Sequence, residues 1–164
     1  MDIKLKDKGF TIIEVVLVLA IAALIFMMVF IALPALQRSQ RDTQRKNDLS
    51  RATTAVGNFT AANRGALPTD WDTFTTQYLT TGGDTFIDPA GANTTNNTTA
   101  TYYIFTTHDG TQLTGKFGSG TSQNIIYYTT SASCDVDGKV KDAGSKTVAL
   151  RMYLEGGGIA CQNN

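Results

Sequence analysis

The sequence has few of the residues on which enzyme active sites depend. Its single histidine, His108, precedes Asp109 and Gly110 in a turn-forming stretch, with no serine or cysteine elbow and no second metal ligand at a useful spacing. A phosphate-cradling glycine loop is also missing. The formal net charge is zero, which gives no attraction to nucleic acid. We therefore expect a protein that is not an enzyme, needs no cofactor and binds no specific nucleic acid.

Charge is absent from one long stretch. From Val15 to Leu33, nineteen residues contain no charged or polar side chain. A helix of this length reaches roughly 28 Å at ~1.5 Å per residue, close to the ~30 Å hydrocarbon core of a bilayer. The segment can therefore span a membrane. A secretory signal peptide is the alternative, but Leu33-Pro34-Ala35-Leu36 does not resemble the small-residue cleavage site that would follow one.

Two features distinguish this segment from a plain membrane anchor. A charged head of nine residues, Met1 to Gly9, precedes it, and an acid, Glu14, lies at its edge. A carboxylate near the centre of a membrane helix costs about 2.5–3.5 kcal/mol, so Glu14 needs a partner that the nearby sequence lacks. Cleavage between Gly9 and Phe10 would create an α-amine. That amine could meet Glu14 of its own chain or of a neighbouring copy, and the second pairing makes a polymer.

The stretch Lys8-Gly9-Phe10-Thr11-Ile12-Ile13-Glu14, followed by the apolar run, resembles the class III signal of type IV prepilins and pseudopilins. The resemblance covers residues 8 to about 36. It implies that a prepilin peptidase cuts after Gly9 and methylates the amine of Phe10. It also implies that Glu14 neutralises the amine of an adjacent subunit. One observation opposes this orientation: the three lysines before the run are outnumbered by basic residues after it, which by the positive-inside rule favours a cytoplasmic C-terminus.

One nearly continuous α-helix is predicted from about Phe10 to Ala62. Its first half, 10–36, is apolar, and Pro34 should kink or loosen it because proline lacks an N–H and clashes with the preceding turn. From Gln37 to Asp48 the helix is polar all round. We interpret this part as a solvated or inter-subunit face, with the pairs Arg38/Asp42 and Asp42/Lys46 at i, i+4 spacing.

The second half of the helix, 37–62, is amphipathic. Leu49, Ala52, Val56 and Phe59 recur at spacings of three and four, a stripe that predicts contact with a sheet. Gly65, with a proline soon after it, predicts the end of the helix.

A globular head is expected at 63–164. It comprises a loop region, 63–100, and an antiparallel sheet, 101–161. In the loop region, Trp71 to Leu79 should form a short helical or irregular segment with its aromatics in the core, and 91–99 reads as an exposed polar loop. Strand-like runs lie at 101–107, 111–117, 123–130 and 147–154, and Asp109-Gly110 is a hairpin signal. Short links predict antiparallel neighbours, which gives an α+β architecture of one long helix packed on a sheet.

Cys134 and Cys161 are the only cysteines. In an exported domain they most simply form one disulfide, although free thiols remain an alternative. The bond would close a loop of roughly 28 residues, for which loop-closure entropy gives roughly 3–4 kcal/mol. Many pilins have a disulfide-bounded loop near the C-terminus, and this pair of cysteines resembles the pair that closes such a loop. Asp135 and Asp137 hint at calcium, but Asp137-Gly138 more often forms a hairpin turn, so we expect no metal site.

These observations together predict a structural subunit. By resemblance it would be a major type IV pilin, a prepilin peptidase substrate held in the cytoplasmic membrane as precursor. It would then polymerise with itself, through the pilus assembly machinery, into an extracellular filament for adhesion and twitching motility. A pseudopilin of a type II secretion or competence system is the first alternative. A membrane-tethered binding protein that never polymerises is the second.

Overall fold

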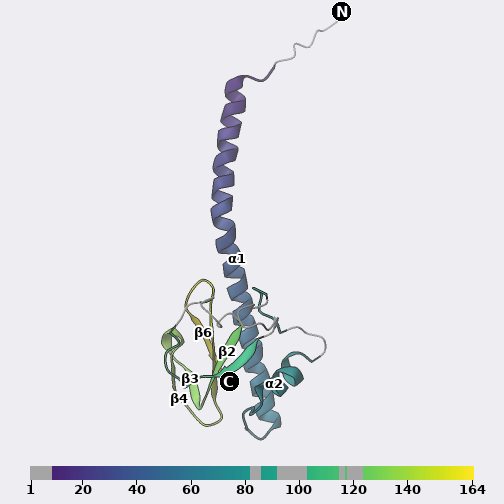
Figure 1. Cartoon of the computed structure of the whole chain (residues 1–164), viewed down its shortest axis with the longest axis vertical. Helices are drawn as coiled ribbons and strands as arrows, with labels where there is room; N and C mark the ends of the chain where they lie inside the picture. Colours follow the sequence, from purple (N-terminus) through teal and green to yellow (C-terminus); the bar gives the residue numbers. More distant parts are fainter. Residues whose placement is uncertain (1–8, 82–85, 92–102, 115–116, 118–123) are drawn as a thin grey trace, which may run out of the picture. The chain divides into compact units, whose positions relative to one another are not determined.

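The computed structural model describes residues 9–81, 86–91, 103–114, 117 and 124–164. The chain divides into two compact units, Met1–Gln37 and Arg38–Asn164, which we call unit 1 and unit 2 and describe separately. Helix α1, Ile12–Ala62, supplies the helical part of unit 1 and continues into unit 2 (Figure 1). The remaining elements all belong to unit 2. Most of the polar loop predicted at 91–99 lies outside the described residues.

Helix α1 follows the predicted boundaries closely. It begins two residues after Phe10 and ends at Ala62 as expected. At its end the Gly65 N–H donates to the Thr60 carbonyl at 2.7 Å, the long bond of a Schellman turn. Arg64 (φ 56°) and Gly65 (φ 86°) both have left-handed backbone. The helix-ending turn, which was predicted at Gly65, therefore starts one residue earlier. Pro34 lies inside the continuous helix, and a kink there remains a prediction.

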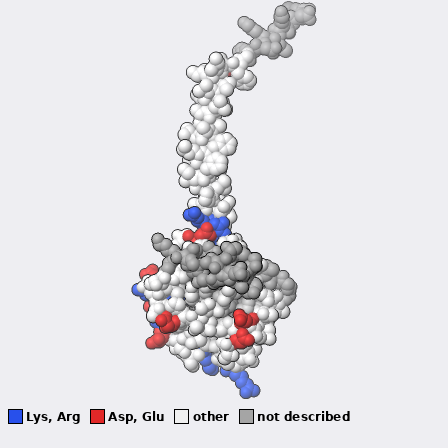
Figure 2. Space-filling model, viewed as in Figure 1, with Lys and Arg blue, Asp and Glu red and all other residues white. Residues whose placement is uncertain are grey.

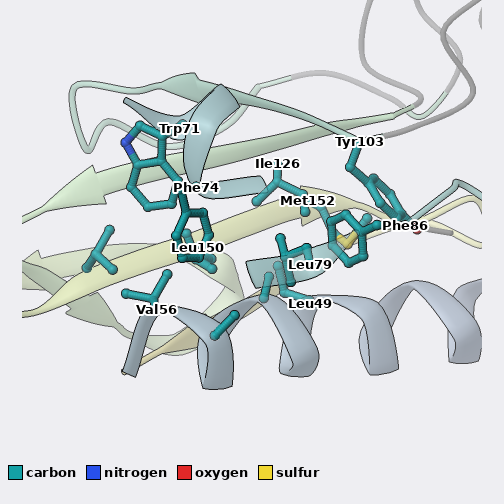
Figure 3. Close-up of a cluster of buried hydrophobic side chains, with 13 residues drawn as sticks. Leu49, Val56, Trp71, Phe74, Leu79, Phe86, Tyr103, Ile126, Leu150 and Met152 are labelled. Atoms are coloured by element: carbon teal, nitrogen blue, oxygen red, sulfur yellow. The ribbon is translucent and has the colours of Figure 1, made fainter. Parts of the chain in front are cut away.

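The stripe predicted on the second half of α1 forms part of the core of unit 2. Leu49, Ala52 and Val56 are fully buried, and Phe59 is partly buried against them. The residues that they meet come from strands β2 (Ile125–Thr130) and β5 (Val148–Tyr153): Ile126, Leu150 and Met152. Figure 3 shows α1 lying along one face of these strands with the labelled side chains between them. The prediction of an α+β fold with the helix packed on a sheet is therefore confirmed.

An aromatic cluster packs at one end of this core. It comes from the segment Trp71 to Leu79, whose aromatic side chains were predicted to lie in the core. The segment forms a short α-helix, α2 (Trp71–Phe74), and a π-helix, η1 (Thr75–Leu79). The Asp70 carboxylate caps α2 by accepting from the backbone N–H groups of Asp72 and Thr73. The Trp71 ring stacks on Tyr128 with centroids 4.3 Å apart. Ring stacking thus fixes this irregular segment to the sheet.

The main sheet has the strand order β1-β2-β5-β6, with β1 at Ile104–Thr107 and β6 at Ile159–Asn163. Strands β2/β5 and β5/β6 are antiparallel as predicted. All six residues of β5 are buried. Strand β6 was not among the predicted strand-like runs, although the predicted sheet extended to residue 161. It pairs along β5 from Tyr153/Ile159 to Ala149/Asn163.

The prediction of antiparallel pairing is wrong for β1, which pairs with β2 in parallel, from Ile104/Ile125 to Thr107/Tyr128. Asp109-Gly110 is therefore not a hairpin turn. The Asp109 carboxylate accepts from the Thr111 N–H at 3.0 Å, which makes a local turn. Parallel strands need a crossover of a dozen or more residues, and the segment 108–124 is long enough. No strand lies in the described part of the predicted run 111–117, namely 111–114 and 117.

A second, two-stranded sheet joins β3 (Ala132–Cys134) to β4 (Val140–Asp142) in antiparallel pairing. The connection is the 3-10 helix η3, Val136–Gly138, so the predicted hairpin turn at Asp137-Gly138 is confirmed. Gly138 has φ 71°, and a Cβ built there would lie 2.5 Å from the Ile159 Cβ. Glycine is required at this position by the backbone conformation and by the close approach of β6.

Candidate functional site

The first turn of α1 contains a capping arrangement that the motif search did not identify. Thr11 precedes the helix, and its backbone N–H and hydroxyl donate to the Glu14 Oε2 at 2.9 and 2.8 Å. The Glu14 backbone N–H points back to the Thr11 Oγ1 at 3.4 Å. This reciprocal pattern is the capping box, whose sequence signature is a threonine three residues before a glutamate. The signal T-x-x-E was therefore available in the sequence.

Capping leaves one oxygen of the Glu14 carboxylate available. Both Thr11 donors reach Oε2, and among the described residues no donor reaches Oε1. Phe10, Glu14, Val15, Val18 and Leu19 line an open, mainly apolar groove of about 480 Å³. The groove presents the carboxylate beside apolar side chains. A cationic group carried by an apolar chain would fit this surface chemically.

The apolar segment itself has no protein covering. Phe10 is 89% exposed, and nearly every large apolar side chain from Ile12 to Leu36 is exposed as well. Helix α1 is long and apolar enough to cross a membrane by length and composition. An exposed apolar surface of this extent is an interaction or membrane surface, because soluble monomers rarely expose more than a few hundred Å² of contiguous apolar area. Figure 2 shows the corresponding lack of acidic and basic surface along this part of the chain.

The comparisons with known proteins agree with this reading of the N-terminus. Residues 4–30 match the family described as the prokaryotic N-terminal methylation motif, the class III signal of type IV pilins. This match supports a type IV pilin or pseudopilin on the evidence of the N-terminal segment. No curated protein and no solved structure matches over the chain. The match thus covers Gly9, Phe10 and Glu14 of this pilin-like protein, and nothing in its head.

The two cysteines of the head are bonded to each other. The Cys134–Cys161 disulfide joins β3 to β6, with the two Cα atoms 5.8 Å apart. It therefore ties the small sheet to the edge strand of the main sheet. The described residues hold no group of three or more histidine, cysteine, aspartate or glutamate side chains that could bind a metal ion.

The polar part of α1 contains a buried charged cluster that sequence reasoning missed. We define this cluster as Arg41, Asp42, Arg45, Asp88 and Glu155. The interpretation of Gln37 to Asp48 as a solvated face is wrong on one side, where Asp42, Arg45 and Asp48 are buried. The predicted pairs also differ: Asp42 pairs with Arg45 at i, i+3, and Arg38 lies nearest Glu155. The acids at 88 and 155 are far from α1 in sequence, so no local pattern could reveal them.

Arg45 is at the centre of the cluster and is fully buried. Its Nε and Nη2 donate to both oxygens of Asp88 at 2.8 Å, and its Nη1 donates to Asp42 Oδ1 at 2.9 Å. The guanidinium carbon also lies 4.1 Å from the centroid of the Phe117 ring. Burial lowers the pKa of Arg45, but the hydrogen bonds and charge of Asp88 outweigh it, and the net pKa is raised. Arg45 therefore stays charged in the interior.

Asp42 attaches the turn between β5 and β6 to α1. Its two oxygens accept from the backbone N–H groups of Glu155 and Gly156 at 2.8 and 2.7 Å. A Cβ built on Gly156 would lie 3.0 Å from the Asp42 Oδ2, so a side chain there would crowd this contact. Arg41 adds a two-pronged bond to the Glu155 carboxylate, and this bond lowers the pKa of Glu155. The cluster thus holds three distant segments of unit 2 together.

Two further polar contacts lie in the head. The Tyr103 hydroxyl donates to Asp48 Oδ2 at 3.1 Å, yet burial dominates and raises the pKa of Asp48. On the other side of the sheet, the buried Arg151 donates to the Thr111 carbonyl and to His108 Nδ1 at 2.9 and 3.0 Å. Burial, and then the charge of Arg151, lower the pKa of His108. The ring is therefore a neutral acceptor, and it pairs with the nearby Asp109 carboxylate only when protonated.

Proposed function

We propose that this protein is the major structural subunit of a type IV pilus. The observation that carries the proposal is the match to the methylation motif at residues 4–30, which includes the start of an apolar segment whose large side chains are exposed. The precursor would be held in the cytoplasmic membrane by residues 10–36, with 1–9 as leader. The head, 63–164, would be attached through the second half of the helix, 37–62, to an extracellular filament that serves adhesion and twitching motility. Its role is structural rather than enzymatic.

The processing step creates the charge that assembly needs. A prepilin peptidase would add water across the Gly9–Phe10 peptide bond, leaving a carboxylate on Gly9 and an amine on Phe10, which is then N-methylated. The methylated amine remains a cation at neutral pH. In the filament it would donate to Glu14 Oε1 of a neighbouring copy, since Thr11 already occupies Oε2. A charged group buried among apolar helices is tolerated only when it is paired in this way.

The apolar halves would then form the filament core. Transfer of these helices from lipid to protein gains little hydrophobic free energy, because both surroundings are apolar. Close packing and the pair between Glu14 and the Phe10 amine must therefore favour the polymer. Separate assembly proteins of the pilus machinery would supply the work of extraction from the membrane.

The N-terminus of the mature protein tests the processing step. Mass spectrometry of protein purified from its native host should find a chain that begins with N-methylated Phe10. A mature chain that still begins at Met1 would refute the proposal.

Assembly is tested separately by variants at the capping box. Glu14→Ala removes both the cap and the proposed salt bridge, whereas Thr11→Val removes the capping hydroxyl and keeps the Glu14 carboxylate. We expect membrane-bound protein without filaments for Glu14→Ala, and filaments for Thr11→Val. Membrane-bound protein without filaments from both the unmodified chain and Glu14→Ala would instead support a membrane-tethered protein. Equal filament yields from the two chains would refute the role proposed for Glu14. Isolation of sheared filaments with this chain as the main component distinguishes a major pilin from a pseudopilin.

A further inference from the structure

Arg38 is the first charged residue after the apolar segment, and its N–H donors reach no acceptor among the described residues. Its side chain is 60% exposed, and its Nε lies 3.8 Å from the Glu155 Oε1, beyond hydrogen-bond distance. It donates no hydrogen bond to any residue in the part of the chain that the structure describes. A guanidinium carries five N–H donors in a planar fork. Arg38 therefore presents an almost complete fork at the surface.

The acids of the charged cluster are already committed to other donors. Glu155 Oε1 accepts from Arg41 Nη2 at 2.5 Å, and Oε2 accepts from Arg41 Nε at 2.7 Å and Arg45 Nη1 at 3.4 Å. Asp42 uses both oxygens for Arg45 and the turn after β5. The cluster contains two cations and three carboxylates, and Arg38 beside Glu155 balances the charge. Because these carboxylates accept their hydrogen bonds from other donors, Arg38 can bind a further anion without taking a donor from the cluster.

The position of Arg38 along α1 indicates which anion it would meet. It lies 24 residues after Glu14, a rise of about 36 Å along a helix. Measured from one edge of the ~30 Å hydrocarbon core, this rise ends about 6 Å beyond the other edge, within a headgroup layer of about 5–8 Å. With Glu14 at one edge of the core, Arg38 is at headgroup level on the other. Its neighbours Gln37, Ser39 and Gln40 are polar and exposed, as suits that level. Figure 2 shows basic and acidic surface side by side where α1 enters unit 2.

We propose that Arg38 binds the phosphate of an anionic phospholipid headgroup while the precursor is in the membrane. The guanidinium fork matches the oxygens of a phosphate. This inference rests on the proposed function, because it requires the apolar segment to be inserted. It also explains how basic residues can follow the apolar run on the outer side. Arg41 and Arg45 are neutralised within unit 2, and Arg38 is neutralised by lipid.

The test measures lipid selectivity of the full-length protein in phosphatidylcholine bilayers by electron paramagnetic resonance. Spin-labelled phosphatidylglycerol or phosphatidylcholine is added to separate samples, and the fraction of motionally restricted lipid gives the relative association constant. One arginine near a charged membrane surface is worth about a fivefold preference at most. Because Glu155 lies nearby, we expect roughly a two- to fivefold preference for phosphatidylglycerol, reduced at high salt.

The variants assign the preference to one side chain. Arg38→Gln should reduce the ratio to about one, and Arg38→Lys should keep most of it, because a lysine still pairs with phosphate as a point charge. The control is Arg64→Gln, which removes the same charge from an exposed position just after the C-terminal end of α1 and should change nothing. Both positions are exposed, so circular dichroism should show folded protein throughout.

The outcomes separate this inference from the proposed function. If no motionally restricted lipid is found with either label, the apolar segment is not inserted and the membrane stage of the proposed function is wrong. If restricted lipid is present without a preference, or with a preference that survives Arg38→Gln, only the Arg38 assignment is overturned. Loss of the preference in inorganic phosphate, at an ionic strength matched with chloride, would show a site for free phosphate and would also overturn the lipid assignment.

Discussion

Replacing Arg45 with methionine tests whether the charged cluster holds unit 2 together. Methionine is unbranched but shorter than arginine and removes the cation, which leaves the fully buried Asp88 carboxylate with the Ala90 N–H as its one remaining donor among the described residues. Removal of one partner of a buried ion pair costs about 3–5 kcal/mol, since the other charge stays desolvated. The loss is large compared with the 5–15 kcal/mol stability of a typical domain.

The assay is urea unfolding of the full chain in detergent, followed by tryptophan fluorescence. Trp71 is the only tryptophan, and it is buried in the core of unit 2, so the signal reports this unit alone. Arg45→Met should lower the unfolding midpoint without a change in slope. The double variant Arg45→Met/Asp88→Asn should recover roughly 1–3 kcal/mol, because the uncompensated carboxylate is gone. A single variant within about 0.5 kcal/mol of the unmodified protein would refute the reasoning, because surface changes alone produce effects of that size.

Three further predictions concern the head. Gly138→Ala should destabilise the head by about 1–3 kcal/mol, because alanine disfavours the left-handed backbone and its Cβ would meet Ile159. The control is Gly157→Ala, where φ is 99° but no atom lies within 4 Å of the added Cβ, so the loss should be smaller. Thermal unfolding compares the two variants. The pKa of His108 is lowered in the folded protein, so the neutral ring contributes fully to the free energy of unfolding above about pH 6.5. This contribution is lost as the pH falls through the pKa of His108 in the folded state. A free energy of unfolding that does not change between about pH 7 and 5 would contradict this prediction. Reducing the disulfide should lower the free energy of unfolding by roughly 3–4 kcal/mol, measured by urea titration with and without reductant.

The sequence predicted those features that depend on local pattern. The extent of α1 follows from an uninterrupted helical pattern that ends in a glycine turn, and the stripe from Leu49 to Phe59 follows from its spacing. The turn at Asp137-Gly138 was also predicted correctly, because both flanking strands lie within a few residues. At Asp109-Gly110 the same signal produced a local turn without a hairpin, since β1 finds its partner across a long crossover.

Two features of the N-terminus show the difference between a recognised motif and its geometry. The roles of Gly9, Phe10 and Glu14 were predicted from a family resemblance, and the match to the methylation motif covers these residues. Their roles in cleavage, methylation and assembly stay predictions. The role of Thr11 was missed, although its spacing to Glu14 is a known capping signal. The structure shows that the cap occupies only one oxygen of Glu14, which is compatible with the pairing proposed for assembly.

The sequence by itself determined the membrane-length apolar segment, the processing motif and the α+β class, because each depends on residues near one another in the chain. Only the tertiary structure decided that Arg45 is an interior residue. Its burial depends on Asp88, 43 positions away, and its neighbour Arg41 depends on Glu155, 114 positions away. A charged side chain is read as exposed until partners that compensate its desolvation are brought to it, and no local pattern specifies partners so distant in sequence.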